Sequence, residues 1–147
     1  MAEDNQMLHD VEQTNEAVTR AFCQAWCDRS CDQLMPLLAE NISYMVYEGG
    51  PTHVGHAAVE GAVRPFLAKF GRVEFEVPRL TVIGDLVIHE RVEDYYAPDG
   101  ERDSHFHVVG LLQIRNGKIE TWRDYGMPGG EQIVGPLITQ AAKEIGS

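Results

Sequence analysis

The chain has 147 residues, of which 44% are hydrophobic and 24% charged, a balance typical of one globular domain that buries a core without metal or disulfide support. Its net charge of −11 argues against nucleic acid or an anionic membrane as a partner, because phosphate binding needs a basic surface. No apolar run reaches the roughly 18 residues of a membrane span, and the acidic N-terminus does not resemble a signal peptide. We therefore expect a single cytoplasmic domain over residues 1–147.

Three cysteines, Cys23, Cys27 and Cys31, recur at every fourth position and fall on one helical stripe. Their odd number favours reduced thiols. A zinc site would need a fourth ligand, and the neighbouring sequence offers none. We expect small packing residues here and no metal site.

The first half of the chain has the pattern of a helical region interrupted by one strand. Residues 1–12 are expected to be flexible, and a helix is expected to start at Thr14 or Asn15, both capping residue types, and to cover residues 16–29. A second helix, a strand and a third helix are expected over residues 31–38, 42–47 and 56–71. Pro65 predicts a kink or a break in the third helix.

Beyond residue 71 the pattern becomes that of a β-meander. Turn sequences separate four long strand-like runs, at Gly84-Asp85, Pro98-Asp99-Gly100 and Asn116-Gly117. A last helix is expected within residues 131–147. Helices followed by a strongly curved, mostly antiparallel sheet define an α+β fold in which a cavity can form between the two layers.

Two of these strands place ionisable residues beside aromatic ones. The period of two puts Arg91 and Glu93 on one face of residues 86–96, together with Val87, His89 and Tyr95. In residues 119–126, Trp122 and Asp124 share a face. On a solvated sheet the Arg91–Glu93 pair would be a surface salt bridge worth less than ~1 kcal/mol. The large apolar rings of Tyr95 and Trp122 argue against an open face, so a polar-lined cavity is the alternative to a solvated sheet.

The motifs Arg91-Val92-Glu93 and Trp122-Arg123-Asp124-Tyr125, with their two acids 31 positions apart, resemble those of the limonene-1,2-epoxide hydrolases. That family has the cone-shaped fold of nuclear transport factor 2 (NTF2), ketosteroid isomerase and SnoaL-like polyketide cyclases. The resemblance covers roughly residues 14–126 and is clearest over residues 86–125. It implies an NTF2-like cone and a homodimer paired through the open face of the sheet.

The resemblance also implies a one-step reaction without metal, cofactor or covalent intermediate. Glu93 would be the general acid that protonates the epoxide oxygen, and Asp124 the general base that activates water. Arg91 would bridge the two carboxyl groups, and Tyr44 would help to hold the water. The implied partners are an apolar small-molecule substrate and water.

The sequence departs from the family pattern at three places. Glu93 stands where the family has aspartate, and Val46, or Tyr47 with one residue inserted, stands at the water-holding asparagine. Gly126-Met127-Pro128 replaces the Phe-Asp that follows the second motif, which predicts a reshaped mouth of the cavity. Asp94 is an alternative first acid, but it points to the strand face opposite Arg91.

Further side chains are expected to contact the substrate: Tyr95, Phe106, Val108, Trp122, Tyr47 and His89. The register places Leu112 on the face of Phe106 and Val108, and puts His105 and His107 on the opposite face, at solvent or a subunit contact. The leading hypothesis is hydrolysis of an epoxide to a vicinal diol. A related cone-fold cyclase or isomerase is the alternative, followed by a non-catalytic small-ligand binder.

Overall fold

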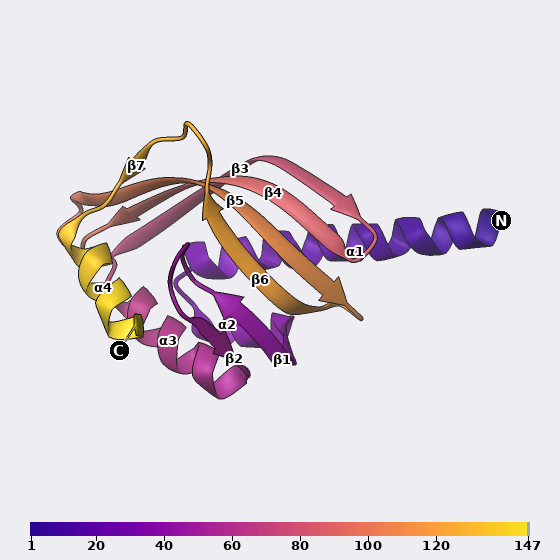
Figure 1. The fold of residues 1–147 in the computed structure, drawn as a ribbon, viewed down its shortest axis with the longest axis horizontal. Helices are drawn as coiled ribbons and strands as arrows, with labels where there is room; N and C mark the ends of the chain where they lie inside the picture. Colours follow the sequence, from indigo (N-terminus) through magenta and orange to yellow (C-terminus); the bar gives the residue numbers. More distant parts are fainter. Residues whose placement is uncertain (147) are drawn as a thin grey trace.

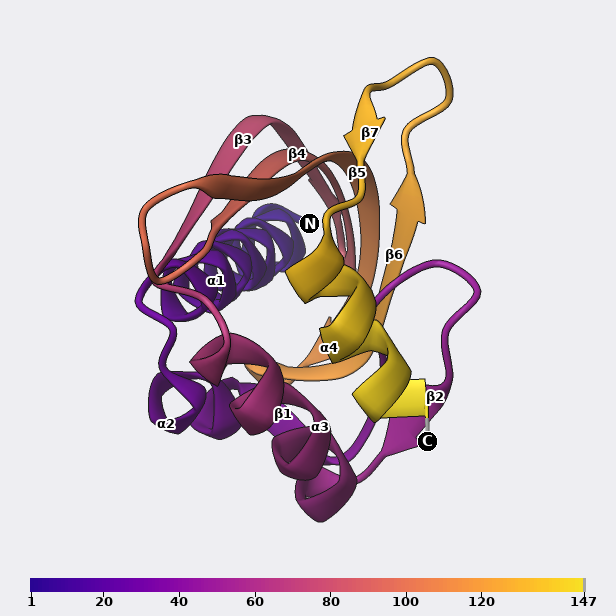
Figure 2. The same cartoon turned by 90° about the vertical axis from the view of Figure 1, so that its left-hand side faces the viewer.

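The structure is a computed structural model that describes residues 1–146. One strongly curved sheet wraps around the C-terminal part of helix α1 (Ala2–Cys27), with the other helices on the same concave side (Figures 1 and 2). The predicted α+β arrangement is confirmed. Within residues 1–146, no helix is both long and apolar enough to cross a membrane.

Helix α1 is longer than predicted, because it begins at Ala2 instead of near Thr14. Asn15 is not a capping residue: it lies inside the helix, is buried, and donates from Nδ2 to the carbonyl oxygen of Gly84 at 2.9 Å. The N-terminal half of α1 projects beyond the sheet (Figure 1) and exposes Met7, Leu8 and Val11. The helical turns before Thr14, which the sequence pattern did not predict, therefore lie in a segment that has no buried apolar stripe.

Two short helical turns follow, α2 (Cys31–Leu34) and η1 (Met35–Leu37), where one helix was predicted over residues 31–38. Ser30 begins α2 as its cap, since its Oγ accepts from the backbone N–H of Gln33 at 3.1 Å. Among the three cysteines, all free, Cys23 and Cys31 are buried and Cys27 is half-buried, as expected of packing residues.

Helix α3 (His56–Ala68) begins where predicted and ends three residues earlier than expected. Pro65 lies inside the helix and does not end it. Helix α4 (Pro136–Gly146) crosses the open end of the cone beside α3 (Figure 2). Asp103 caps its start, since its carboxylate accepts from the backbone N–H groups of Leu137 and Ile138, both at 3.0 Å.

The sheet has the order β2-β1-β6-β5-β4-β3, and β7 adds to β5. Its strands are β1 (Leu38–Met45), β2 (Thr52–Val54), β3 (Arg72–Ile83), β4 (Leu86–Tyr96), β5 (Arg102–Arg115), β6 (Lys118–Gly126) and β7 (Gln132–Ile133). The meander from β3 to β6 is as predicted, whereas β1 starts four residues earlier than expected. Strand β1 pairs with β6 in parallel, with Tyr44 opposite Trp122, and the remaining pairs are antiparallel.

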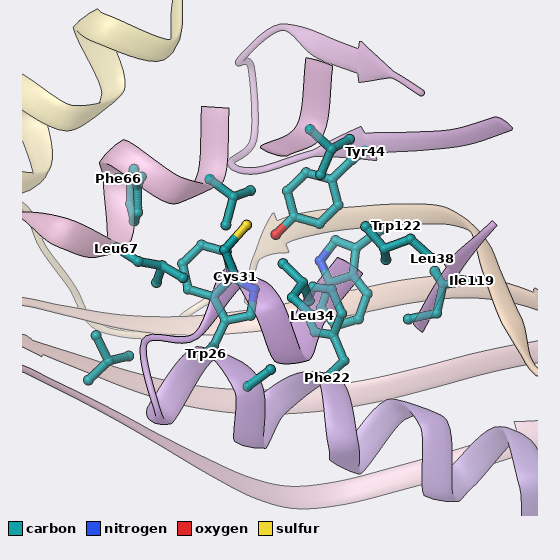
Figure 3. Close-up of a cluster of buried hydrophobic side chains, with 14 of the residues drawn as sticks. Phe22, Trp26, Cys31, Leu34, Leu38, Tyr44, Phe66, Leu67, Ile119 and Trp122 are labelled. Atoms are coloured by element: carbon teal, nitrogen blue, oxygen red, sulfur yellow. The ribbon is translucent and has the colours of Figure 1, made fainter. Parts of the chain in front are cut away.

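An aromatic cluster joins α1 to the sheet (Figure 3). The rings of Phe22 and Trp122 stack with centroids 3.5 Å apart, and Tyr44 stacks on the same indole at 6.2 Å. Trp26 meets Phe66 of α3 edge to face at 5.6 Å. Because such contacts bury large apolar rings, they fix β1, β6 and α3 around α1 and hold the inner face of β6 in place.

Candidate active site

The inward face of β4 carries the residues that strand alternation predicted. Arg91, Glu93 and, across the sheet on β6, Asp124 are only 1%, 6% and 8% exposed. Three charged groups this deeply buried need mutual pairing, because an isolated ion in an apolar interior is very costly. They form one hydrogen-bonded cluster in which a single arginine joins both acids.

Arg91 bridges the two carboxyl groups. Its Nε and Nη2 donate to Oε2 of Glu93 at 2.7 and 2.5 Å, and Nη2 also donates to Oδ2 of Asp124 at 2.8 Å. Nη1 donates to Nε2 of His89 at 2.6 Å. The rings of Phe75 and Trp122 lie 5.2 and 5.4 Å from the guanidinium carbon. The fork geometry of arginine thus fixes both acids from one side.

A glycine on the intervening strand makes this bridge possible. Gly110 of β5 pairs with His89 of β4 and with Asp124 of β6, so it lies directly under the path of the guanidinium. A Cβ at this position would lie 2.9 Å from Nη1 of Arg91 and would collide with the imidazole of His89. Sequence reasoning missed Gly110, although an isolated glycine within a strand is a signal of close approach.

The two acids differ in how fully they are hydrogen-bonded. Glu93 accepts from Arg91 at Oε2 and from the hydroxyl of Tyr95 at Oε1, at 2.8 Å. Asp124 accepts from Arg91 at Oδ2, while its buried Oδ1 has no partner among the described residues. Asp124 therefore keeps one oxygen available for a proton.

Burial raises the pKa of Asp124 from 3.8 to about 6. The positive charge of Arg91 lowers this pKa, and the negative charge of Glu93 raises it. Two carboxyl groups held by one guanidinium do not both ionise at low cost, so the cluster readily retains one proton. A carboxylate with a pKa near neutrality is well suited to act as a base.

His89 is neutral and belongs to the support of the site. Burial and the adjacent Arg91 lower the pKa of His89 to about 3. Because an arginine N–H can only donate, Nε2 of His89 accepts and its ring proton lies on Nδ1. The imidazole thus holds Nη1, the guanidinium nitrogen of Arg91 that does not bind a carboxyl group.

The carboxyl groups open into a cavity of about 710 Å³ with mostly apolar walls. Six of the predicted site residues line it: Glu93, Asp124, Tyr95, Phe106, Val108 and Tyr47. Arg91, Tyr44, Trp122 and His89 are buried and are not among the residues that line the cavity. Leu112 shares the face of Val108 but lies in the core below.

Helix α4 supplies a wall that the motif analysis did not include. Ile138, Thr139, Ala142 and Lys143 line the cavity, and Phe66 of α3 lines it from the facing helix. The hydroxyl of Tyr47 donates to the carbonyl oxygen of Ala142 at 3.2 Å and so ties α4 to the segment after β1. The apolar spacing of residues 138, 141 and 145 was the available sequence signal for a packed helix.

The two candidates for the water-holding position face different surroundings. Val46 and Tyr47 both line the cavity, but the Tyr47 hydroxyl is engaged with α4. Tyr44 is buried beside the acid cluster, where burial and Asp124 raise its pKa well above 10, so that it remains a neutral phenol.

The outer face of the sheet carries a separate set of polar pairs. Asp94 points away from Arg91, as predicted, and Oδ1 of Asp94 lies 2.7 Å from Nδ1 of His105. His107 Nε2 lies 2.7 Å from Oε1 of Glu90. Both histidines are half-buried rather than freely exposed. Within residues 1–146, no cluster of three or more histidine, cysteine or acidic side chains is placed to hold a metal ion.

The curved sheet and the helices on its concave side define an NTF2-like cone protein, with a buried acid pair at its cavity. Residues 19–122 match the SnoaL-like domain family. Because the match covers more than half of the chain, the protein belongs to this family. No curated protein sequence matches it.

Solved structures with the same fold include several kinds of cone protein. An LEH-like epoxide hydrolase from M. tuberculosis aligns with a TM-score of 0.70 at 19% identity, over 90% of this chain and 92% of that chain. A putative SnoaL-like polyketide cyclase from Jannaschia sp. CCS1 aligns with a TM-score of 0.67 at 15% identity, over 90% of this chain and 92% of that chain. A hypothetical protein with a ketosteroid isomerase-like fold from Catenulispora acidiphila, in complex with trimethylamine, aligns with a TM-score of 0.62 at 24% identity, over 74% of this chain and 83% of that chain. These likenesses confirm the predicted cone fold.

Proposed function

We propose that this protein adds water to an epoxide in one step and releases a vicinal diol. The observation that carries the proposal is the pairing of Glu93 and Asp124 by one buried guanidinium at the floor of an apolar cavity. The fold shared with an LEH-like epoxide hydrolase supports it. In this proposal Glu93 is the general acid, Asp124 the general base and Arg91 the positioning group for both.

The chemistry needs one proton delivered and one removed. Asp124 takes a proton from a water as the water oxygen forms a bond to an epoxide carbon. The bond between that carbon and the epoxide oxygen breaks, and the oxygen receives the proton held by Glu93. General acid and base assistance of this kind is typically worth about 10²–10⁴-fold each. The low dielectric of the cavity strengthens the electrostatic contribution of Arg91.

The cavity favours an apolar epoxide. Phe66, Phe106, Val108 and Ile138 line it, and the charged side chains among its walls are Glu48, Glu93, Asp124 and Lys143. Its volume of about 710 Å³ lies within the range of pockets that enclose drug-sized ligands. An apolar substrate that carries a ring would pack against these walls while its epoxide group reaches Glu93 and Asp124.

A cyclase that opens an epoxide with a hydroxyl of the same substrate is the second candidate. Val46 favours it, because this apolar side chain lines the cavity where the resembling family places a water-holding asparagine. An internal hydroxyl would replace the water as nucleophile, and Asp124 would take its proton instead. The same cluster serves both reactions.

Isotopically labelled water distinguishes epoxide hydrolysis from cyclisation. When the protein turns over an epoxide in ¹⁸O-water, we expect one labelled oxygen in the diol, measured by mass spectrometry, because the nucleophile is water. An unlabelled cyclic product would establish the cyclase instead. The Asp124→Asn variant, assayed in parallel, is the control for uncatalysed hydrolysis.

Activity should also depend on pH through Asp124. Its pKa of about 6 means that the carboxyl is protonated below that pH and cannot accept a proton from water. We expect kcat/KM to fall about tenfold per unit below pH 6, because this ratio reports the ionisation of the free enzyme. A pH–rate profile between pH 4 and 9 measures it, and an acid limb near pH 4 would contradict the assignment.

A further inference from the structure

The carboxyl group of Glu93, the proposed general acid, is hydrogen-bonded to other side chains of the protein. Oε2 of Glu93 receives two hydrogen bonds from Arg91, at Nε and Nη2. Oε1 lies 2.8 Å from the hydroxyl of Tyr95, which lines the same cavity. Both oxygens of this carboxyl are therefore occupied by the protein.

The pattern of bonds decides where a proton on Glu93 can reside. A carboxylate oxygen has two in-plane acceptor positions, and the two N–H groups of Arg91 occupy those of Oε2. A proton on Glu93 must then sit on Oε1, and its hydrogen-bond partner there is the oxygen of Tyr95. When Oε1–H donates to Tyr95, the hydroxyl hydrogen of Tyr95 is released to point elsewhere, toward the cavity that this side chain lines.

We propose that the hydroxyl of Tyr95 relays the proton from Glu93 to the epoxide oxygen and is thus a catalytic residue of the site. The inference rests on the proposed hydrolysis and adds a step to it. As water bonds to carbon and the C–O bond of the epoxide breaks, the epoxide oxygen takes the hydrogen of Tyr95. Tyr95 takes the proton of Glu93 Oε1, and Asp124 takes the proton of the water. One proton leaves Glu93 and one arrives on Asp124, so no other reactant is needed.

Tyr95 is suited to passing a proton rather than to losing one. Burial and the neighbouring carboxyl of Glu93 raise the pKa of Tyr95 well above 10, so a free phenolate does not form. In the relay the phenol stays neutral, because it receives a proton as it gives one up. Its ring is held by Phe70, Phe75 and Phe106 at centroid distances of 5.1, 6.2 and 6.0 Å, which fixes the hydroxyl against Oε1.

Removing the hydroxyl tests the relay. Tyr95→Phe retains the ring contacts, so we expect the protein to fold and kcat for diol formation to fall by about 10²-fold, within the usual range for general acid catalysis. KM should change little, because the apolar wall is retained. Tyr96→Phe is the matched control: Tyr96 neighbours Tyr95 on the same strand but faces the outer side of the sheet, against Arg72, and should keep the wild-type rate.

A second variant separates proton transfer from simple positioning of Glu93. Site-specific replacement of Tyr95 by fluorotyrosines retains the hydroxyl but makes it more acidic, so kcat should vary with phenol acidity if this hydrogen is transferred. A wild-type kcat in Tyr95→Phe, or a kcat insensitive to fluorination, would overturn the relay and leave hydrolysis standing. A wild-type protein that converts no epoxide would instead overturn the proposed function, and the relay with it.

Discussion

Asp124→Asn is expected to lower kcat for diol formation by between about 10² and 10⁴-fold, because an amide cannot take the proton of the attacking water. Asp124 is the acid with an unpartnered oxygen, Oδ1, and with a pKa raised by burial to about 6. Steady-state kinetics on an epoxide that the wild-type protein hydrolyses measures the effect. A variant that retains the wild-type rate would remove Asp124 from the base role.

The fold should survive this substitution. Asparagine has nearly the same shape, its carbonyl oxygen can accept from Arg91, and Arg91 remains paired with Glu93. The matched control is Asp94→Asn on the outer face of β4, where the carboxylate contacts His105 and Arg102. Thermal melts should show both variants folded, with activity lost only in Asp124→Asn.

Strand periodicity was the most informative part of the sequence. A period of two places alternate residues of β4 on one face, and the structure buries Val87, His89, Arg91, Glu93 and Tyr95 together. The turn residues at 84–85, 98–100 and 116–117 indicated a meander, so the strands that pair with β4 could be predicted as well. Local chemistry was sufficient here because hairpin pairing is determined by adjacent segments.

The parts that could not be predicted depend on contacts between distant segments. The parallel pairing of β1 with β6 brings Tyr44 beside Trp122, and no local signal encodes a partner so far along the chain. The hydrogen bond from Tyr95 to Glu93 depends on a rotamer fixed by four phenylalanines from other segments of the chain. The position of α4 across the cavity depends on its capping by Asp103 of β5.

The resemblance and the geometry contribute different parts of the site. The motif spacing suggested which acids would meet, whereas the structure adds what holds them together: a glycine on the strand between them and a neutral histidine behind the arginine. Without Gly110, a side chain on β5 would block the guanidinium that joins β4 to β6. The candidate chemistry thus depends on three adjacent strands and not on either motif alone.

Arg91→Met is expected to lower both activity and stability. Methionine fills much of the space but leaves Glu93 and Asp124 buried without their shared cation, and breaking a buried ion pair in this way typically costs about 3–5 kcal/mol. Turnover should fall by at least about 10²-fold, since both acids lose their positioning group. Arg102→Met is the control, because its pairing with Asp94 on the outer face of the sheet is partly exposed and worth less than about 1 kcal/mol.

The loss of stability in Arg91→Met should depend on pH, which distinguishes an electrostatic cause from poor packing. Arg91 lowers the pKa of Asp124, so removing it lets that pKa rise further above its already raised value. A carboxyl whose folded-state pKa is raised stabilises the fold below its unfolded pKa of 3.8, and this contribution is lost as pH rises through the folded-state pKa. Urea denaturation at pH 5 and pH 8 should therefore give a larger deficit relative to wild type at pH 8. An equal deficit at both values would assign the loss to packing around the methionine.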